Sequence, residues 1–265
     1  MSENLTNSPA DYIGEDGLLY CGNCHTPKED YYPPGFLISG KHFVMCKCRE
    51  KESDEEQRRI KERDRQCHVD QLRRTCFHAP TMHSWTFKNA GEETAQIRLA
   101  KSYVENWKEM KANNAGFLFW GDVGTGKSYT AACIANALID QEVSVRMTSF
   151  PEILNGVFEC DNKNDYIFDL NRYELLILDD VGIERASEWS LAVISSVISL
   201  RVDAARPLII TTNRSLKEMH AARDMEHRRI YDRILAVCTP VSFSGKSYRV
   251  NEGKEHMELI RSLIG

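Results

Sequence analysis

The stretch GDVGTGKS, from Gly121 to Ser128, constrains the fold of this chain more than any other part of the sequence. It satisfies the pattern G-x-x-x-x-G-K-[ST], follows the apolar run GFLFW and precedes the run KSYTAACIANALID. Glycines let the backbone turn so that N–H groups point toward a polyphosphate, and a following helix adds its partial positive charge. The pattern therefore predicts a strand, a phosphate-binding loop and a helix in succession.

The residue types in this loop predict separate roles. Lys127 would reach the β and γ phosphates of a nucleotide, and the Ser128 hydroxyl would ligate Mg²⁺. The alternative is a glycine-rich surface turn, which would not require a strand before it and a helix after it. The nucleotide-binding residues that we predict are Gly121, Asp122, Val123, Gly124, Thr125, Gly126, Lys127, Ser128 and Tyr129.

Apolar strand patterns and helical patterns alternate after this loop. The runs VSVRMTSF, ELLILDD and PLIITTN and the stretch from Val237 to Phe243 predict strands, and runs with helical periodicity separate them. Two Ser-x-x-Glu pairs have the spacing of capping boxes, which mark helix starts. Strands separated by helices predict an α/β fold with a parallel sheet covered on both faces.

Two of these predicted strands end in polar residues: Asp179 and Asp180 in one, and Asn213 in the other. The carboxyl ends of parallel strands form the edge at which open α/β sheets bind ligands. We predict that Asp179 binds Mg²⁺ either directly or through a ligand of the ion. Asp180 would orient or deprotonate the attacking water. The Asn213 amide would hydrogen-bond the γ phosphate or the water, although a plain turn before the next helix is an equally natural interpretation.

The order of these features, followed by RRIYDRI and GKSYR, resembles the AAA+ ATPases, and most closely the helicase loaders of the DnaC/DnaI type in bacteria and phages. The resemblance implies an AAA+ P-loop NTPase fold that binds ATP. It identifies Lys127 and Ser128 as Walker A residues and Asp179 and Asp180 as the Walker B pair. Asn213 takes the sensor 1 position.

The same resemblance implies roles for three arginines. Arg233 in YDRI is similar to the arginine finger that reaches the ATP of a neighbouring subunit, and Arg249 in SYR is similar to sensor 2. Arg229, one turn before Arg233, would support that boundary or contact DNA. Both helix arginines could instead be solvated charges on an amphipathic helix.

Two departures from the AAA+ pattern affect these expectations. The second Walker B acid is Asp180 where AAA+ enzymes usually have glutamate, and the shorter side chain predicts slow turnover that suits a switch. Sixteen residues follow Arg249, so we expect a missing C-terminal lid or one reduced to EHMELIRSLI.

Four of the nine cysteines lie in the first fifty residues, in two close pairs. The spacings C-x₂-C and C-x-C suit a tetrahedral structural Zn²⁺, with His25 and His42 as reserve ligands. Four free buried thiols are the alternative, but a region of this size with few large apolar residues needs added stability. The predicted zinc ligands are Cys21, Cys24, Cys46 and Cys48.

We predict three regions. Residues 1–50 form a zinc-ribbon-like domain, residues 51–84 a charged helical linker, and residues 85–265 the AAA+ ATPase domain. In similar loaders the N-terminal region holds the replicative helicase. Tyr31, Tyr32 and Phe36 would contact this partner or would form the core of the ribbon.

Composition limits the other functions that the chain can have. A net charge of −5 argues against coating DNA by bulk charge, so any contact with nucleic acid must be local. No apolar run approaches the length of a membrane span, and the N-terminus lacks the pattern of a secretory signal. We therefore expect a cytoplasmic protein that does not act at a membrane.

The resemblance implies an ATP-dependent loader that places the replicative hexameric DNA helicase on single-stranded DNA. Its cofactors would be ATP, Mg²⁺ and Zn²⁺, and it would associate with itself through the ATP site. An IstB-like ATPase that regulates a transposase is one alternative. An adaptor that binds ATP with little hydrolysis is another.

Overall fold

The computed structural model describes residues 10–35, 38–77, 79–182, 187–222, 224–245, 247–248, 257–258 and 260–264. The chain divides into two compact units, Met1–Cys67 and His68–Gly265. Within the described ranges, no helix combines the length and the apolarity that crossing a bilayer requires.

The first unit contains two small antiparallel sheets. Strand β1 (Tyr12–Ile13) pairs with β2 (Leu19–Tyr20), and β3 (Glu29–Tyr31) pairs with β4 (Lys41–Phe43). The second pair of strands lies between the two cysteine pairs in the sequence. Helix α1 (Lys47–Cys76) then begins, and its highly charged stretch is exposed on nearly all sides.

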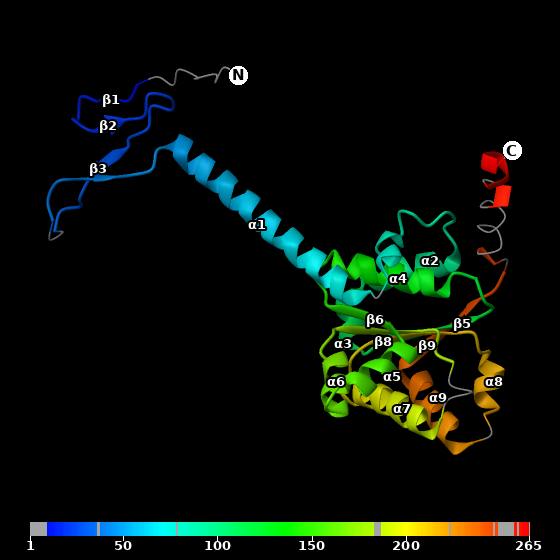
Figure 1. Ribbon diagram of the computed structural model, residues 1–265. Coiled ribbons are helices and arrows are strands. Elements are labelled where there is room, and N and C mark those ends of the chain that lie inside the picture. Colours follow the sequence, from blue (N-terminus) through cyan, green and yellow to red (C-terminus); the bar gives the residue numbers. More distant parts are fainter. Residues whose placement is uncertain are drawn as a thin grey trace. The chain divides into compact units, whose positions relative to one another are not determined.

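The second unit is built on a five-stranded parallel sheet with the order β6-β7-β8-β5-β9 (Figure 1). Its strands are β5 (Gly116–Gly121), β6 (Val145–Ser149), β7 (Leu175–Asp179), β8 (Leu208–Thr212) and β9 (Cys238–Phe243). Every pairing in this sheet is parallel, so all five carboxyl ends lie at one edge. The α/β fold with a parallel sheet is confirmed.

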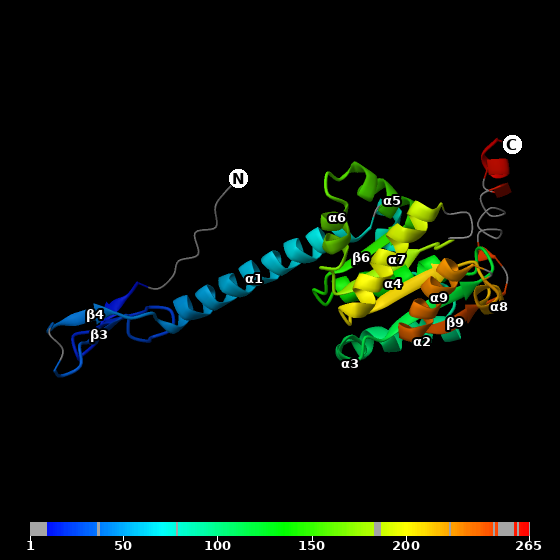
Figure 2. The same ribbon diagram turned by 90° about the horizontal axis from the view of Figure 1, so that it is seen from below.

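Helices cover both faces of this sheet (Figure 1 and Figure 2). Among the described residues, the labelled helices that follow α1 are η1 (Pro80–Ser84), α2 (Ala95–Glu105), α3 (Trp107–Ala112), α4 (Lys127–Ile139), α5 (Phe150–Glu159), α6 (Lys163–Leu170), α7 (Glu188–Asp203), α8 (Leu216–His220) and α9 (Met225–Val237). Residues 257–258 and 260–264 are also helical. The two predicted capping boxes are present at the starts of α5 and α8.

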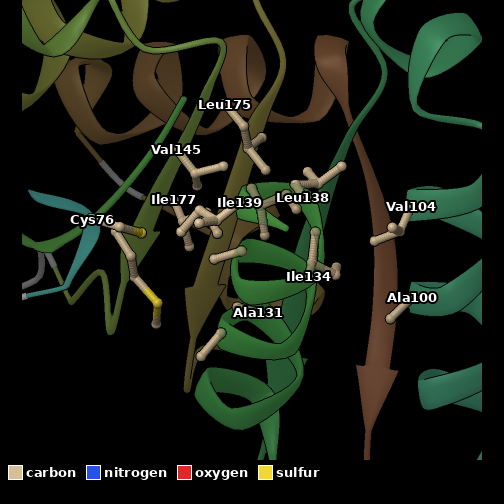
Figure 3. Packing of buried hydrophobic residues seen from close by; sticks show 14 of the residues in the cluster. Cys76, Ala100, Val104, Ala131, Ile134, Leu138, Ile139, Val145, Leu175 and Ile177 are labelled. Carbon is tan, nitrogen blue, oxygen red and sulfur yellow. The ribbon is translucent and has the colours of Figure 1, made fainter. Parts of the chain in front are cut away.

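The strand residues alternate between two apolar cores. Leu175 and Ile177 of β7 pack with α2 and α4 on one face, whereas Leu176 and Leu178 pack with α5, α7 and α9 on the other. Helix α4 is buried almost all round, and Figure 3 shows its side chains packed among residues of the sheet and of α2. The phosphate loop is therefore fixed between a central strand and a buried helix.

The end of α1 differs from the predicted linker. Val69 and Cys76, together with Met82 of η1, are buried in the same apolar cluster as Val145 and Ile177 (Figure 3 labels Cys76). The charged part of the helix is solvated, but its last two turns carry an apolar stripe that needs a partner surface. The core of the second unit therefore begins before residue 85, the predicted start of the ATPase domain.

Candidate nucleotide site and metal centre

The phosphate loop connects the end of β5 to the start of α4. Gly121 has φ +134°, and a Cβ there would lie 2.0 Å from the Phe243 carbonyl oxygen of β9. Gly126, with φ +95°, occupies the N-cap position of α4 in the left-handed conformation. Both positions require glycine, and they aim the loop at the N-terminus of a 13-residue helix, where anions are favoured.

Lys127 is buried within this loop and is 7% exposed. Its ammonium group donates to the main-chain carbonyls of Gly121 and Asp122, at 2.8 and 2.6 Å. The Thr125 hydroxyl donates to the same Asp122 carbonyl, at 2.8 Å. The Lys127 ammonium group is thus held beside the turn, where it could exchange its carbonyl partners for phosphate oxygens.

Tyr129 lies one turn into α4, and its side chain leads away from the loop. Its hydroxyl donates to the Thr86 carbonyl at 3.1 Å, and its ring lies 5.7 Å from that of Trp85. Burial raises the pKa of the Tyr129 hydroxyl to about 12. The Tyr129 side chain is thus committed to packing, so only its main chain could serve the nucleotide.

The paired aspartates and the predicted sensor asparagine come together at the edge of the sheet. Asp179 ends β7, Asp180 follows it, and Asn213 follows the neighbouring strand β8. The Asn213 amide donates to the Asp180 carboxylate at 2.8 Å. Asp180 has φ +50°, in the left-handed region that few residues other than glycine adopt.

Thr211 was not among the predicted site residues, although its side chain lies between the two aspartates. Its hydroxyl donates to Asp179 Oδ1 at 2.6 Å and accepts from the Asp180 main-chain N–H at 2.8 Å. The available signal was the pair Thr211–Thr212, two hydroxyls at the end of an otherwise apolar buried strand. Such hydroxyls need partners, and a neighbouring acidic strand end offers them.

The strand order brings the loop and the acidic residues to one edge. Strand β8 lies between β7 and β5, with Thr211 opposite Phe119 and Ile210 opposite Leu178. The loop after β5 and the polar residues after β7 and β8 therefore leave the sheet side by side. Ser128 and Asp179 supply oxygen ligands of the kind that Mg²⁺ prefers, so the residues at this edge fit that ion.

A cavity of about 490 Å³ opens beside the acidic residues at this edge. It is lined by Phe150, Pro151, Asp180, Val181, Gly182, Thr212, Asn213, Arg214 and Glu218. Asp180 and Asn213 therefore face this cavity, whereas no residue of the phosphate loop is among its lining residues.

The predicted arginines are placed unequally. Ile230 and Ile234 are each 2% exposed and bury one face of α9, whereas Arg229 and Arg233 are exposed on that helix. Arg249 lies outside the described residues. Just before it, the Tyr248 main-chain N–H donates to the Gly124 carbonyl at 2.9 Å, so the chain that leads to Arg249 passes against the phosphate loop.

In the first unit, the sulfur atoms of Cys21, Cys24, Cys46 and Cys48 lie within 4.8 Å of one another. Four thiolates around Zn²⁺ at about 2.3 Å would lie about 3.8 Å apart, so a small contraction would close the site. The chemistry of this donor set fits zinc. His25 and His42, the reserve ligands, are not part of the cluster among the described residues.

Local hydrogen bonds hold the two cysteine pairs together. The Thr26 hydroxyl lies 3.0 Å from the Cys24 sulfur and also accepts from the Lys47 main-chain N–H at 3.1 Å, at the start of α1. The Thr26 hydroxyl lowers the pKa of the Cys24 thiol to about 5, and a hydrogen bond with Cys24 raises the pKa of Cys48 to about 11. Of these two sulfurs, Cys24 is therefore the one that loses its proton more readily, as metal binding requires.

Comparison with known proteins agrees with this geometry. Residues 41–256 match the family described as IstB-like ATP binding protein. The replicative helicase loader DnaC of Escherichia coli strain K12 is 30% identical over 164 residues, which are 59% of this chain and 64% of DnaC. The chain thus spans less than two thirds of the length of that relative. The uncharacterized protein YdaV of the same strain is 24% identical over 223 residues, 81% of this chain and 89% of YdaV.

Solved structures share the fold. The crystal structure of DnaI has a TM-score of 0.56 at 22% identity, covering 65% of this chain and 94% of DnaI. The crystal structure of the DnaC helicase loader has a TM-score of 0.55 at 18% identity, covering 63% of this chain and all of the DnaC structure. DnaA of Aquifex aeolicus bound to AMPPCP has a TM-score of 0.51 at 20% identity, over 70% of this chain and 57% of DnaA.

These likenesses confirm the predicted AAA+ P-loop fold. The family match extends over most of the chain, from strand β4 to beyond the end of β9. This chain therefore belongs to the family of IstB-like ATP binding proteins.

Proposed function

We propose that this chain is an ATP-dependent loader of the replicative DNA helicase onto single-stranded DNA. The observation that carries the proposal is the 30% identity to the replicative helicase loader DnaC over 164 residues. The loop around Lys127 and the acidic edge with Asp179 and Asp180 support ATP hydrolysis as the step that switches the loader between its states.

In this proposal the loop and the acidic edge divide the work on ATP. Lys127 and the loop N–H groups bind the β and γ phosphates, and Ser128 and Asp179 hold Mg²⁺, which neutralises charge on those phosphates. Asp180 orients the attacking water and takes its proton, while Asn213 reports on the γ phosphate through its contact with Asp180. The short Asp180 side chain makes turnover slow.

Self-association completes the site in the same proposal. Arg233 is exposed on α9, whose buried face is fixed by Ile230 and Ile234. An arginine supplied by a neighbouring subunit stabilises charge on the transferred phosphoryl group and can be worth about 10³–10⁵ in rate. Arg249 would act on the ATP of its own subunit, and Arg229 would support the subunit boundary.

The zinc ribbon would hold the helicase through an apolar surface. Tyr31 and Phe43 lie on one face of the β3–β4 hairpin and are 50% and 82% exposed, with Met45 nearby at 60%. Exposed apolar side chains of this size mark interaction sites. Tyr32, by contrast, is half-buried, and its ring centroid lies 4.7 Å from that of His42.

Single-stranded DNA would contact the α5–α6 hairpin. Phe158 is 82% exposed on α5, and the Lys163 ammonium lies 5.5 Å from the Trp189 ring centroid. Figure 2 shows α5 and α6 beside α7, which carries Trp189. Aromatic faces next to a cation are typical of surfaces that stack bases and bind the phosphate backbone.

Capture of a hexameric replicative helicase by the immobilised chain tests the proposal. We expect the helicase to co-purify with the wild-type chain in ATP but not in ADP. With Lys127→Ala it should co-purify in neither nucleotide. Lys111→Ala is the control, because Lys111 is a half-exposed lysine of α3 that forms an ion pair with Glu174. Equal capture in ATP, ADP and neither nucleotide would contradict an ATP-dependent loader.

The family match favours one second candidate, an IstB-like ATPase that regulates a transposase. The same capture experiment with a transposase in place of the helicase separates the two. Retention of the transposase alone would select the second candidate.

A further inference from the structure

Thr211 occupies a central position in the sheet. It is 1% exposed and pairs with Phe119 on β5. Three groups at the end of β7 contact it: the Asp179 carboxylate, the Asp180 N–H and the Val181 N–H, which donates to the Thr211 carbonyl at 2.8 Å. One residue of β8 therefore contacts three consecutive residues that include both acids.

The direction of each hydrogen bond follows from the chemistry of the groups. The Asp180 main-chain N–H can only donate, so the Thr211 hydroxyl oxygen accepts from it. The single hydroxyl proton is then available for Asp179 Oδ1, which lies 2.6 Å away and can only accept when ionised. The hydroxyl thus fixes the orientation of the Asp179 carboxylate while its oxygen binds the next residue.

Asp180 needs this support because its backbone is left-handed. Its φ of +50° is uncommon for a residue with a side chain and persists where surrounding contacts determine it. The Thr211 hydroxyl binds its N–H, and the Asn213 amide binds its carboxylate at 2.8 Å. The contacts come from β8 and from the residue directly after it, so this segment sets the direction in which Asp180 points.

We propose that Thr211 is a positioning residue of the nucleotide site. Its hydroxyl orients Asp179 toward Mg²⁺ and maintains the left-handed turn that aims Asp180 at the attacking water. The inference rests on the proposed ATP-hydrolysing function and adds to it a residue outside the predicted site. Removing a hydrogen bond to a metal-binding side chain typically lowers metal affinity or activity by about 10–100-fold.

Three variants separate positioning from packing. Thr211→Val keeps the shape of the side chain and removes the hydroxyl, and Thr211→Ser keeps the hydroxyl. Thr148→Val is the matched control, because Thr148 is 0% exposed on the neighbouring strand β6 and its hydroxyl donates to Glu152 at 2.9 Å rather than to Asp179 or Asp180.

The measurements are binding of a fluorescent ATP analogue over a Mg²⁺ titration, steady-state ATP hydrolysis, and thermal unfolding without ligand. For Thr211→Val we expect the half-saturating Mg²⁺ concentration to rise about 10-fold and kcat to fall about 10-fold or more. Two quantities should stay within about threefold of the wild-type values, because the phosphate loop is unaltered. They are the nucleotide affinity without Mg²⁺ and the KM for ATP at saturating Mg²⁺. Thr211→Ser should recover most of both losses.

A purely structural role predicts a different result. In that case Thr211→Val and Thr148→Val would lower the unfolding temperature alike, and neither would change the Mg²⁺ titration, which overturns the inference while the proposed function stands. A wild-type chain that binds no nucleotide in the presence of Mg²⁺ would instead overturn the proposed function and the inference together.

Discussion

The Asn213 amide donates a hydrogen bond of 2.8 Å to the Asp180 carboxylate, across 33 positions of sequence. The contact joins the predicted sensor to the predicted acid. It also accounts for the departure from the usual Asp-Glu pair. The left-handed backbone at Asp180 is tolerated better by aspartate than by glutamate, and the short side chain meets Asn213 directly.

Asp180→Asn should abolish hydrolysis and preserve binding. The amide keeps the size and the left-handed preference of the residue but removes the carboxylate that would take a proton from water. We expect kcat to fall about 100-fold or more, with Mg²⁺-dependent nucleotide affinity within about threefold. Phosphate release measures kcat, and binding of a fluorescent nucleotide measures the affinity. Asp203→Asn, at the exposed end of α7, is the control and should change neither. Hydrolysis that persists in Asp180→Asn would remove Asp180 from the proposed chemistry.

Mixing two inactive variants should restore activity if Arg233 acts on a neighbouring subunit. Arg233→Ala retains its own phosphate loop and Lys127→Ala retains its own arginine, so a mixed assembly contains some complete sites. We expect each variant alone to lose DNA-stimulated hydrolysis by about 10³-fold or more and the mixture to regain a measurable fraction. Arg228→Ala on the same helix is the control and should retain activity. Full hydrolysis by Arg233→Ala alone would exclude the finger.

Removal of one cysteine should empty the predicted zinc site and affect the first unit alone. Cys24→Ser is expected to lower bound zinc from about one ion per chain to none, because three thiolates no longer close the tetrahedral site. Elemental analysis measures the metal, and all four tryptophans lie in the second unit, so their fluorescence reports unfolding there. Cys67→Ser, at an exposed cysteine of α1, is the control. Equal zinc content in Cys24→Ser and the wild type would refute the site.

Arg201→Met should destabilise the second unit without touching the nucleotide site. The Arg201 guanidinium is 1% exposed and donates to the main-chain carbonyls of Pro207, Tyr173 and Glu174, at 2.6 to 2.8 Å. Methionine fills the space but removes the shortest hydrogen bond to each of these carbonyls, which we expect to lower the free energy of unfolding by about 3 kcal/mol. That corresponds to a fall of roughly 6–12 °C in the unfolding temperature followed by tryptophan fluorescence.

Arg206→Met provides the comparison for this change. Arg206 donates to the Asn171 and Arg172 carbonyls, at 2.7 and 2.8 Å, but is partly exposed, so water can replace it. Arg206→Met should lower the free energy of unfolding by less than half as much as Arg201→Met does. Equal effects would show that burial of the guanidinium is not what makes Arg201 important.

Trp189→Ala should weaken binding of single-stranded DNA. Loss of one stacking ring is expected to reduce the free energy of binding by about 1–3 kcal/mol, with little dependence on base sequence. Fluorescence anisotropy of a labelled oligonucleotide measures the affinity, and Trp85→Phe is the control because Trp85 packs near Tyr129 on the opposite core. Unchanged affinity in Trp189→Ala would place DNA elsewhere on the chain.

The sequence by itself determined the local features of this protein. A glycine-rich loop between a strand and a helix, strands alternating with helices, and cysteines in two close pairs are patterns of neighbouring residues. They predicted an α/β fold with a phosphate-binding loop and a four-cysteine cluster. The buried stripe of Ile230 and Ile234 was readable for the same reason, since residues four apart share a helix face. Local spacing carries this information because backbone geometry fixes it.

The tertiary structure decided which of these features meet. The order β6-β7-β8-β5-β9 places Thr211 against Asp179, 32 positions away, and lets β8 hold Asp180 in a left-handed turn. It also buried the end of α1, which the charge pattern had assigned to a linker. Strand neighbours are selected by the packing of two cores distributed along the chain, and no short stretch of sequence contains that information.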